Sequence, residues 1–332
     1  MNAVPVTKTQ IFPVERRHSS KLAPADFQRE YVAANRPVVV ENAVPDWPAL
    51  RKWTLEFFKS EFRDEEVDVS YDARMKMGDF IDGVLASTPE RPGPYLYRLF
   101  ICPHLPRLLP DVMPQNRYSF PYRYASPLMP RAWRRPDGYI KLLIGGAGSR
   151  FPIVHYDGDN AHATVTQVYG DKTFVLFAPE DGQFLYPKKH FPNHSRIPDI
   201  DEVDAETFPL FAHATRYQTI LHPGDMVFIP CGWWHSARVF GPSISIGQNI
   251  LDGSNWKRFV QLVCAGSTGL PPWKRWPRRL WLQSLGGLFT LRQRWLPPDR
   301  PRPRSLLARW SPMFSEEVRD PGEWPMKTWI QS

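Results

Sequence analysis

The chain has 332 residues, of which 42% are hydrophobic and 23% charged, a balance typical of soluble globular proteins. Its three cysteines, Cys102, Cys231 and Cys264, form no Cys-x-x-Cys pair, which disfavours a disulfide framework and a cysteine-ligated zinc site. The N-terminus lacks the apolar core of a signal peptide, and no run approaches the roughly 18 apolar residues of a membrane span. We therefore expect a cytoplasmic protein with no membrane span.

The positive charge is concentrated near the C-terminus. The whole chain carries a net charge of +8, and residues 271–310 hold ten Lys or Arg and one acidic residue. The rest of the chain is therefore close to neutral. The same stretch contains five tryptophans. We favour a helical appendage that packs on the body or forms a homodimer over a surface for nucleic acid or an anionic membrane.

Short helices and strands are predicted to alternate over the first hundred residues, because the 36 prolines of the chain disfavour long helices. A helix is expected to start at Asp26, and Thr54 is placed to cap another. The remaining expected elements are a strand at 36–40, strands at 67–69 and 95–97, and a helix start at 77–82. Residues 102–136, rich in Pro and Arg, are expected to be irregular.

The second half of the chain predicts many short strands separated by turn residues. Six are expected, at 139–144, 162–168, 173–177, 217–221, 226–229 and 243–248. The glycine-rich segment 145–149 is interpreted as a hairpin turn, because it lacks the Gly-Lys-Ser/Thr ending of a phosphate loop. A helix should follow at 255–264. We expect a mostly β fold with flanking helices and a double-stranded β-helix core, the jelly roll of cupins.

The pattern that indicates chemistry is His155-Tyr156-Asp157, followed much later by His235. In an extended strand the side chains of residues i and i+2 point to one face, so His155 and Asp157 can bind one metal ion together. His235 follows the apolar segment 224–230, whose end a jelly roll would bring to the same barrel mouth. Two His and one carboxylate leave coordination positions open, which suits non-haem Fe(II).

Alone, a His-x-Asp tripeptide is as consistent with a surface turn as with a metal site, and zinc hydrolases use the same ligand types. Four further histidines lie between the ligand segments and are interpreted as exposed loop residues rather than a second metal site: His190, His194, His213 and His222. A basic loop with Trp133 could line a substrate entry, with Arg131, Arg134 and Arg135 around that tryptophan.

The ordered set of motifs resembles the JmjC-type 2-oxoglutarate oxygenases, in particular their asparaginyl-hydroxylase-like branch. The resemblance runs from about residue 26 to 260. It rests on Arg36-Pro37-Val38-Val39-Val40, Trp47-Pro48-Ala49-Leu50, Leu142-Leu143-Ile144-Gly145, His155-Tyr156-Asp157, Gln167-Val168-Tyr169-Gly170-Asp171-Lys172 and Pro223-Gly224-Asp225 through Trp233-Trp234-His235. It implies Fe(II) and 2-oxoglutarate as cofactors.

The resemblance also implies residue roles. Lys172 occupies the family position whose ammonium pairs with the distal carboxylate of 2-oxoglutarate, and either Tyr95 or Tyr97 would give a hydroxyl to it. Asn249 ends the final strand, where the family has an Asn. The chain departs from the family pattern at Pro152, where Thr is frequent, and at Ala163, where Asn is frequent.

These observations predict three regions: an N-terminal extension at 1–25, an oxygenase domain at 26–265 and a basic helical extension at 266–332. The predicted activity is hydroxylation of a C–H bond in a protein or peptide side chain. A small-molecule hydroxylase of the same mechanism is the alternative, and a non-catalytic metal-binding cupin with a nucleic-acid-binding tail is a second. The segment 297–304 is expected to be an extended linker.

Overall fold

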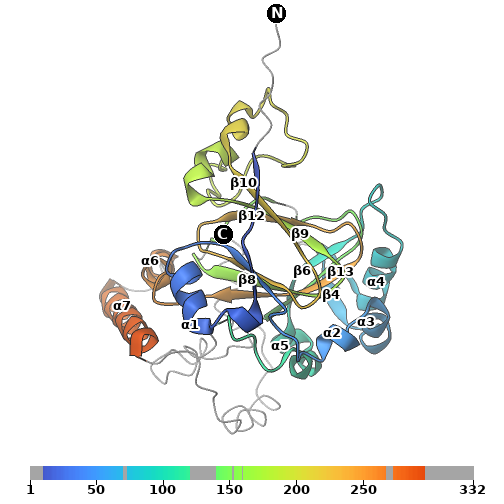
Figure 1. Cartoon of the computed structure of the whole chain (residues 1–332), viewed down its shortest axis with the longest axis horizontal. Helices are drawn as coiled ribbons and strands as arrows, with labels where there is room; N and C mark the ends of the chain where they lie inside the picture. Colours follow the sequence, from blue (N-terminus) through green and yellow to red (C-terminus); the bar gives the residue numbers. More distant parts are fainter. Residues whose placement is uncertain are drawn as a thin grey trace, which may run out of the picture.

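The structure is a computed structural model that describes residues 10–69, 73–119, 140–151, 153–158, 160–266 and 272–295. Two β-sheets form its centre (Figure 1). Predictions that involve Pro152, the basic loop around Trp133 and the 297–304 linker lie outside the described residues. Within the described ranges, none of the helices combines the length and the apolar character needed to cross a membrane.

The larger sheet has seven strands in the order β2-β3-β11-β8-β13-β7-β6. Their bounds are β2 Arg16–His18, β3 Val38–Glu41, β11 Met226–Ile229, β8 His162–Tyr169, β13 Ser243–Ile250, β7 Ile140–Gly145 and β6 Tyr95–Phe100. All pairs are antiparallel except β2 with β3. The central strand β8 is buried along nearly its whole length, as expected for a strand covered on both faces.

The smaller sheet has four strands in the order β1-β10-β9-β12, with bounds β1 Ile11–Pro13, β10 Arg216–Leu221, β9 Lys172–Phe177 and β12 Trp234–Arg238. From β8 onward the chain passes repeatedly between the two sheets: β8 lies in the large sheet, β9 and β10 in the small one, β11 in the large, β12 in the small and β13 in the large. One apolar cluster joins strands of both sheets and includes Leu143, Val165, Leu176 and Val227. This arrangement confirms the predicted jelly-roll core.

Short helices cover the outer face of the large sheet. They are α1 Pro24–Phe27, η2 Gln28–Val32, α2 Ala49–Lys52, α3 Leu55–Glu61, α4 Met77–Leu85, α5 Ile101–His104 and η3 Pro106–Val112. Their apolar side chains share one core with the sheet, for example Phe58 and Phe80 with Leu142 and Phe228. Thr54 caps α3 as predicted, since its hydroxyl accepts the Phe57 N–H at 3.1 Å. The antiparallel pair of β4 Glu66–Asp68 and β5 Arg74–Lys76 lies between α3 and α4 in the chain.

The segment between β9 and β10 forms a subdomain of its own on the smaller sheet. It contains η7 Pro179–Leu185 and η8 Pro209–His213 and extends above β10 in Figure 1. Its core joins Leu185 and Phe211 to Val175 and Phe177 of β9 and to Trp234 of β12. The subdomain therefore packs directly on β12, which carries His235, and on its neighbour β9.

Two helices follow the last strand. They are α6 Trp256–Gly266 and α7 Pro272–Trp295, and Figure 1 shows them on the side opposite α2–α4. Trp256 and Val260 pack against Leu282 and Leu285, and the Trp256 indole donates a 2.6 Å hydrogen bond to the Leu282 carbonyl. The prediction of a helix at 255–264 is confirmed. The expectation that the many prolines disfavour long helices is wrong for α7, which has 24 residues and contains Pro277 near its start.

Three local predictions need correction. The segment 145–149 forms a turn, with the Ser149 N–H bonded to the Gly146 carbonyl, but it closes no hairpin, because Arg150 then pairs with Arg238 of the other sheet. Part of the segment expected to be irregular forms α5 and η3. Finally, β1, β2 and β12 were not predicted; β1 and β2, which precede residue 26, add parallel edge strands to the two sheets.

Candidate metal centre

The structure brings His155, Asp157 and His235 together. One ligand atom from each lies within 4.8 Å of the other two, and no other such group of His, Cys, Asp or Glu occurs in the described part of the chain. His235 follows the apolar strand β11, as predicted, and is the second residue of β12, a strand that was not predicted. His155 and Asp157 lie in an irregular segment between β7 and β8. The predicted strand there is reduced to isolated bridges of His155 with His194 and His235.

Backbone hydrogen bonds align the two imidazoles. The His235 N–H donates to the His155 carbonyl at 2.7 Å, and the His155 N–H donates to the His235 carbonyl at 3.1 Å. This closed pair brings the ring centroids to 4.4 Å. Phe151 also stacks on the His155 ring, with ring centroids 4.5 Å apart and an interplanar angle of 20°. The His155 ring therefore packs against both a phenyl group and its partner imidazole.

Each imidazole is also fixed in one tautomer. Nδ1 of His155 lies 3.0 Å from the Ile153 carbonyl oxygen, and Nδ1 of His235 lies 3.0 Å from the Trp233 carbonyl oxygen. A carbonyl only accepts, so each Nδ1 carries the proton and donates it. The lone pair of each ring is therefore on Nε2, where a metal ion would be bound.

Burial keeps the His155 imidazole neutral. Desolvation first, and then the neighbouring imidazole of His235, lower the pKa of His155 to about 3, while the Asp157 carboxylate opposes the shift. A neutral imidazole is the form that binds a metal, so His155 needs no deprotonation near neutral pH. Two nitrogen donors and one carboxylate form an N,N,O set that fits a divalent first-row metal.

The subdomain between β9 and β10 holds the first ligand segment. The Tyr156 N–H donates to the Asn193 carbonyl at 3.1 Å, and the Asn193 amide donates back to the Tyr156 carbonyl at 3.1 Å. The Tyr156 ring packs edge-on against Trp234 at 5.0 Å. Residues on both sides of Tyr156 are metal-ligand candidates, so this clamp sets the direction in which they point. No sequence signal identified Asn193.

Of the four loop histidines, three are exposed as predicted: His190, His213 and His222. His194 differs, because it is partly buried and its ring lies edge-on to that of His155 at 6.3 Å. Burial lowers the pKa of His194. It contributes to the wall around His155 without joining the group of three.

A cavity of about 130 Å³ opens beside this group. All seven predicted site residues line it: the three candidate ligands together with Lys172, Tyr95, Tyr97 and Asn249. Tyr95 and Tyr97 share one face of β6, as expected, and their ring centroids are 6.3 Å apart. The structure therefore joins residues from β6, β9, β12 and β13 around one space.

Lys172 is a buried cation on the wall of this cavity. It is 2% exposed, and its Nζ donates to the Ser245 hydroxyl at 3.0 Å. No carboxylate of the described residues lies within 4.0 Å of this ammonium, and desolvation lowers the pKa of Lys172 to about 7. The Tyr95 ring provides partial compensation, with its centroid 5.1 Å from Nζ. An isolated buried ammonium is costly, so the site is suited to an anionic ligand.

A relay of buried polar groups orients Lys172. The Ser245 hydroxyl donates to the Gln167 amide oxygen at 2.9 Å. The Gln167 amide nitrogen in turn donates to the carbonyls of Tyr169 and Gly170, each at 2.8 Å, and lies 2.9 Å from the Ser243 hydroxyl. The β8–β9 turn and β13 thus fix the position of the Lys172 ammonium through Gln167 and Ser245.

Asn249 lies elsewhere on the cavity wall, where its amide oxygen accepts a 3.0 Å hydrogen bond from the Lys141 ammonium. Lys141, Phe151, Gln167 and Ser245 were not assigned to the site from the sequence. For Lys141 the sequence did offer a signal. Lys141 and Leu143 lie two residues apart in the predicted strand, and residues i and i+2 of a strand share a face, so both could be expected on the same side of the sheet. For the others, only the folded neighbourhood reveals the role.

The chain matches the Cupin-like domain family over residues 24–251, more than two thirds of its length. It is 30% identical to the Jumonji C domain-containing protein 5 of Drosophila melanogaster over 237 residues, covering 67% of this chain and 56% of that protein. It is 25% identical to the human bifunctional peptidase and (3S)-lysyl hydroxylase JMJD7 over 250 residues, covering 64% and 76%.

It is also 30% identical to the tRNA wybutosine-synthesizing protein 5 of Danio rerio over 242 residues, covering 66% of this chain and 71% of that protein. The chain spans about half the length of the first curated relatives it matches. The asparaginyl-hydroxylase-like branch stays a prediction. The chain belongs to the Cupin-like domain family and carries a JmjC-type domain, and JmjC enzymes are oxygenases that use Fe(II) and 2-oxoglutarate.

Proposed function

We propose that this chain is an Fe(II)- and 2-oxoglutarate-dependent dioxygenase that hydroxylates a C–H bond in a protein or peptide side chain. Substrate, O₂ and 2-oxoglutarate would give the alcohol, succinate and CO₂. The observation that carries the proposal is the pair of imidazoles whose Nδ1 atoms both donate to backbone carbonyls, with Asp157 completing the set. Bound iron would supply the activation of O₂ that no side chain can provide.

His155, Asp157 and His235 would hold the iron. Three protein ligands would leave other coordination positions of the ion open for 2-oxoglutarate and O₂. The hydrogen bonds to Ile153 and Trp233 keep both imidazoles oriented for this task. Phe151, which stacks on His155, would exclude water from that side of the ion.

Lys172 would bind the distal carboxylate of 2-oxoglutarate. Support comes from its burial, its hydrogen bond to Ser245 and the lack of a carboxylate partner among the described residues. A carboxylate placed against this ammonium would restore its positive charge and gain a charge-assisted hydrogen bond. Tyr95 is the better placed of the two tyrosines to add its hydroxyl, because its ring already contacts the ammonium. Asn249, which also lines the cavity, would contact the co-substrate as well.

A protein or peptide substrate is favoured by the human relative, whose name describes a lysyl hydroxylase. The alternative is a small-molecule hydroxylase with the same site. A nucleic-acid substrate is the third possibility, prompted by the zebrafish relative's name and by α7, which has six basic residues and no acidic one. We propose a cytoplasmic location, which is supported by three cysteines that form no disulfide.

The proposal is tested by incubating Fe(II)-loaded protein with 2-oxoglutarate under ¹⁸O₂ and pools of peptides, small metabolites or tRNA in parallel. Succinate formation should be stimulated by the peptide pool, and mass spectrometry should find a peptide heavier by one ¹⁸O atom. Asp157→Ala is the matched control and should give neither product. Stimulation by the metabolite or tRNA pool alone would reassign the substrate class, and no succinate in any arm would contradict the oxygenase activity.

A further inference from the structure

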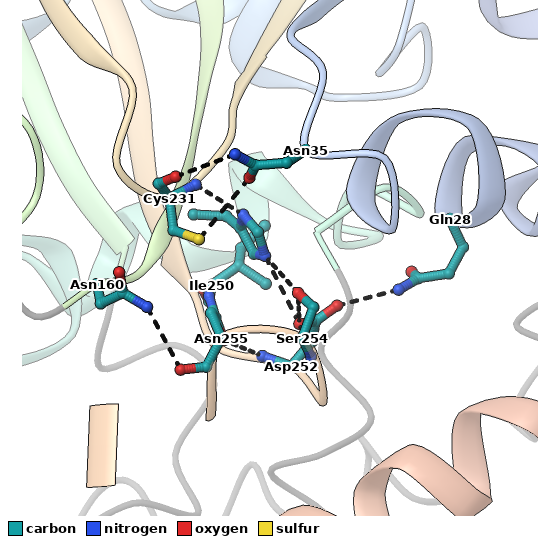
Figure 2. A network of polar contacts seen from close by, with 9 residues as sticks. Gln28, Asn35, Asn160, Cys231, Ile250, Asp252, Ser254 and Asn255 are labelled. Carbon is teal, nitrogen blue, oxygen red and sulfur yellow. Dashed lines mark hydrogen bonds and ion pairs between the residues drawn. The ribbon is translucent and has the colours of Figure 1, made fainter. Parts of the chain in front are cut away.

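A buried polar network surrounds residues 230–233, the turn that leads from β11 into the strand carrying His235. Figure 2 shows Asn35 and Cys231 at one end of the network, Gln28 at another, and Asp252, Ser254 and Asn255 below them. The metal centre and cavity described above include none of these residues. Because buried polar groups are costly unless they are paired, a network of this size needs an explanation.

His162, the first residue of β8, is the centre of the network and is 1% exposed. The backbone N–H of Cys231 donates to its Nδ1 at 2.9 Å. Nδ1 therefore carries the lone pair, and the proton lies on Nε2, which faces the Ser254 hydroxyl at 3.0 Å and Asp252 Oδ1 at 3.6 Å. This is the opposite tautomer from that of the two metal-ligand candidates.

Asp252 fixes that tautomer from the other side. Its Oδ1 accepts the Ser254 hydroxyl at 2.6 Å and the Ser254 N–H at 2.8 Å, and its Oδ2 accepts the Gln28 amide at 3.0 Å. Burial alone would raise the pKa of Asp252, but hydrogen bonds from His162 and Ser254 more than offset it and lower the pKa. The carboxylate is therefore ionised and oriented, and it keeps the Nε2 proton of His162 in place.

Asn35 holds the same turn from a second direction. Its backbone lies in the left-handed region, with φ of 52°, which Asn tolerates better than most residues. Its side-chain amide lies 3.5 Å from the Cys231 carbonyl, and its own carbonyl accepts the Trp233 indole N–H at 2.9 Å. The turn is thus clamped by two chain segments remote from it in sequence.

The last residue of this turn, Trp233, orients His235. Its carbonyl oxygen accepts the hydrogen bond from Nδ1 of the His235 imidazole. We propose that His162 is a positioning residue: by accepting the Cys231 N–H it fixes the turn whose Trp233 carbonyl aims the His235 imidazole at the metal. The inference rests on the proposed function, since it assigns His162 a task only if His235 binds a metal.

The same three residue types form the catalytic triad of hydrolases, and the geometry excludes that role here. A triad histidine must offer an unprotonated Nε2 to the serine hydroxyl. Nε2 of His162 carries the proton, and the Ser254 hydroxyl instead donates to Asp252. His162 and Asp252 are 1% and 3% exposed, so no substrate reaches them. The network is structural, and its effect on chemistry passes through the turn.

The test compares two amide substitutions at one position. Asparagine can place its oxygen where Nδ1 of His162 lies and keep the acceptor for Cys231. Glutamine reaches the Nε2 position, keeps a partner for Ser254 and Asp252, and leaves the Cys231 N–H without its acceptor. Co(II) is the probe, because its visible absorption reports both affinity and coordination geometry.

We expect His162→Gln to bind Co(II) about tenfold more weakly, the lower end of the effect of ligand-orienting groups, with an altered absorption spectrum. His162→Asn should keep the wild-type affinity and spectrum. Asp111→Asn, which alters a buried carboxylate bonded to Trp53 in the helical layer, controls for a general loss of stability and should leave Co(II) binding unchanged.

Equal Co(II) binding by the Gln and Asn variants would overturn the inference, whether both match the wild type or both lose affinity, because the acceptor at Nδ1 would then make no difference. Failure of the wild-type protein itself to bind Co(II) is a separate outcome. It would contradict the proposed function and the positioning role with it.

Discussion

At the residue scale, Lys172 is the side chain whose environment constrains it most. It is one of the largest fully buried side chains in the structure, and its polar contact is with Ser245. Burial lowers its pKa from an ordinary 10.5 to about 7. Because the folded-state pKa lies below the unfolded-state value, the unfolded chain binds more protons between these two pH values, and stability rises with pH in that window.

The first prediction concerns this proton in the protein without co-substrate. The free energy of unfolding should increase as pH rises from about 7 toward 10, and Lys172→Met should remove that increase. Urea unfolding at several pH values measures it. Lys257, an exposed lysine of α6, offers the control, since Lys257→Met should leave the pH dependence as in the wild type. If the free energy of unfolding changed with pH to the same extent in the wild type and in Lys172→Met, the conclusion that Lys172 is a buried lysine with a lowered pKa would be contradicted.

The second prediction concerns 2-oxoglutarate binding. Above pH 7 the co-substrate should bind with uptake of about one proton, because its carboxylate restores the charge on Lys172. Calorimetry at pH 8 in two buffers of different ionisation enthalpy measures this uptake. Lys172→Met should weaken binding roughly 10- to 100-fold, the worth of a hydrogen bond between charged groups, and should abolish the uptake. A binding enthalpy that is independent of the buffer would contradict the role of Lys172.

A third prediction concerns Gly145, the last residue of β7. A Cβ there would lie 2.8 Å from the Tyr95 ring and 2.9 Å from the Ser149 hydroxyl. Gly145→Ala should therefore lower the free energy of unfolding by about 1–3 kcal/mol and weaken 2-oxoglutarate binding, since Tyr95 must shift. Gly241→Ala is the control, because nothing lies within 4 Å of its Cβ. Urea unfolding that shows the same stability for both variants would contradict this account of the cavity wall.

At the scale of elements, α7 is the feature whose packing leaves most to explain. One side of it contacts α6 through Leu282 and Leu285. Its large apolar side chains on the surface include Trp273, Trp276 and Trp281, which are 71%, 68% and 51% exposed. A row of exposed tryptophans on one helix is typical of an interaction surface. We propose that this surface pairs with α7 of a second copy of the chain.

The fourth prediction tests that pairing. The double variant Trp273→Glu and Trp276→Glu should convert a dimer to a monomer in sedimentation velocity, because two carboxylates would be buried in the interface. Phe240→Glu changes another exposed aromatic residue, which is 60% exposed and lies between β12 and β13 rather than on α7, and should leave the dimer intact. A wild-type protein that sediments as a monomer at every concentration would contradict the dimer and favour nucleic acid or an anionic membrane as the partner.

At the scale of the whole molecule, the sequence predicted the fold through its strongest local signals. The β-branched residues of β3 and β8 and the turn residues before β9 and β11 all identified strands that the structure contains. The three-residue strands β1 and β2 were missed because their pairing with β10 and β3 depends on tertiary contacts rather than on periodicity. Their side chains are largely exposed, so no apolar alternation marks them.

The candidate site was predictable to a similar extent and for similar reasons. His155, Asp157 and His235 stood out because of their place among the predicted strands and because of the resemblance to the JmjC-type oxygenases, since a His-x-Asp tripeptide alone does not distinguish a metal site from a surface turn. The strand β12 was missed because it follows β11 after only a short turn. Ser245, Gln167 and Asn193 are common residue types whose roles exist only through their partners. Nothing in a single sequence marks a buried hydroxyl that holds a lysine.

The two terminal helices also depend on one another. Trp256 is 1% exposed, and α7 covers it through Leu282 and Gly286. Deleting residues 267–332 to isolate the basic region would therefore expose Trp256 and cost roughly 1.5–3 kcal/mol, the value for one large buried side chain. Charge reversal of Arg279, an exposed residue of α7, is the cleaner way to ask whether the basic helix binds nucleic acid.

The central claim is that His155, Asp157 and His235 hold an iron ion to which 2-oxoglutarate binds. Anaerobic titration of the Fe(II)-loaded protein with 2-oxoglutarate, followed by visible absorption, tests it most directly. We predict a metal-to-ligand charge-transfer band that saturates with 2-oxoglutarate in the wild type and is lost in His155→Ala and Asp157→Ala. A folded, metal-loaded wild-type protein that shows no such band would contradict the account and leave a metal-binding cupin without oxygenase chemistry.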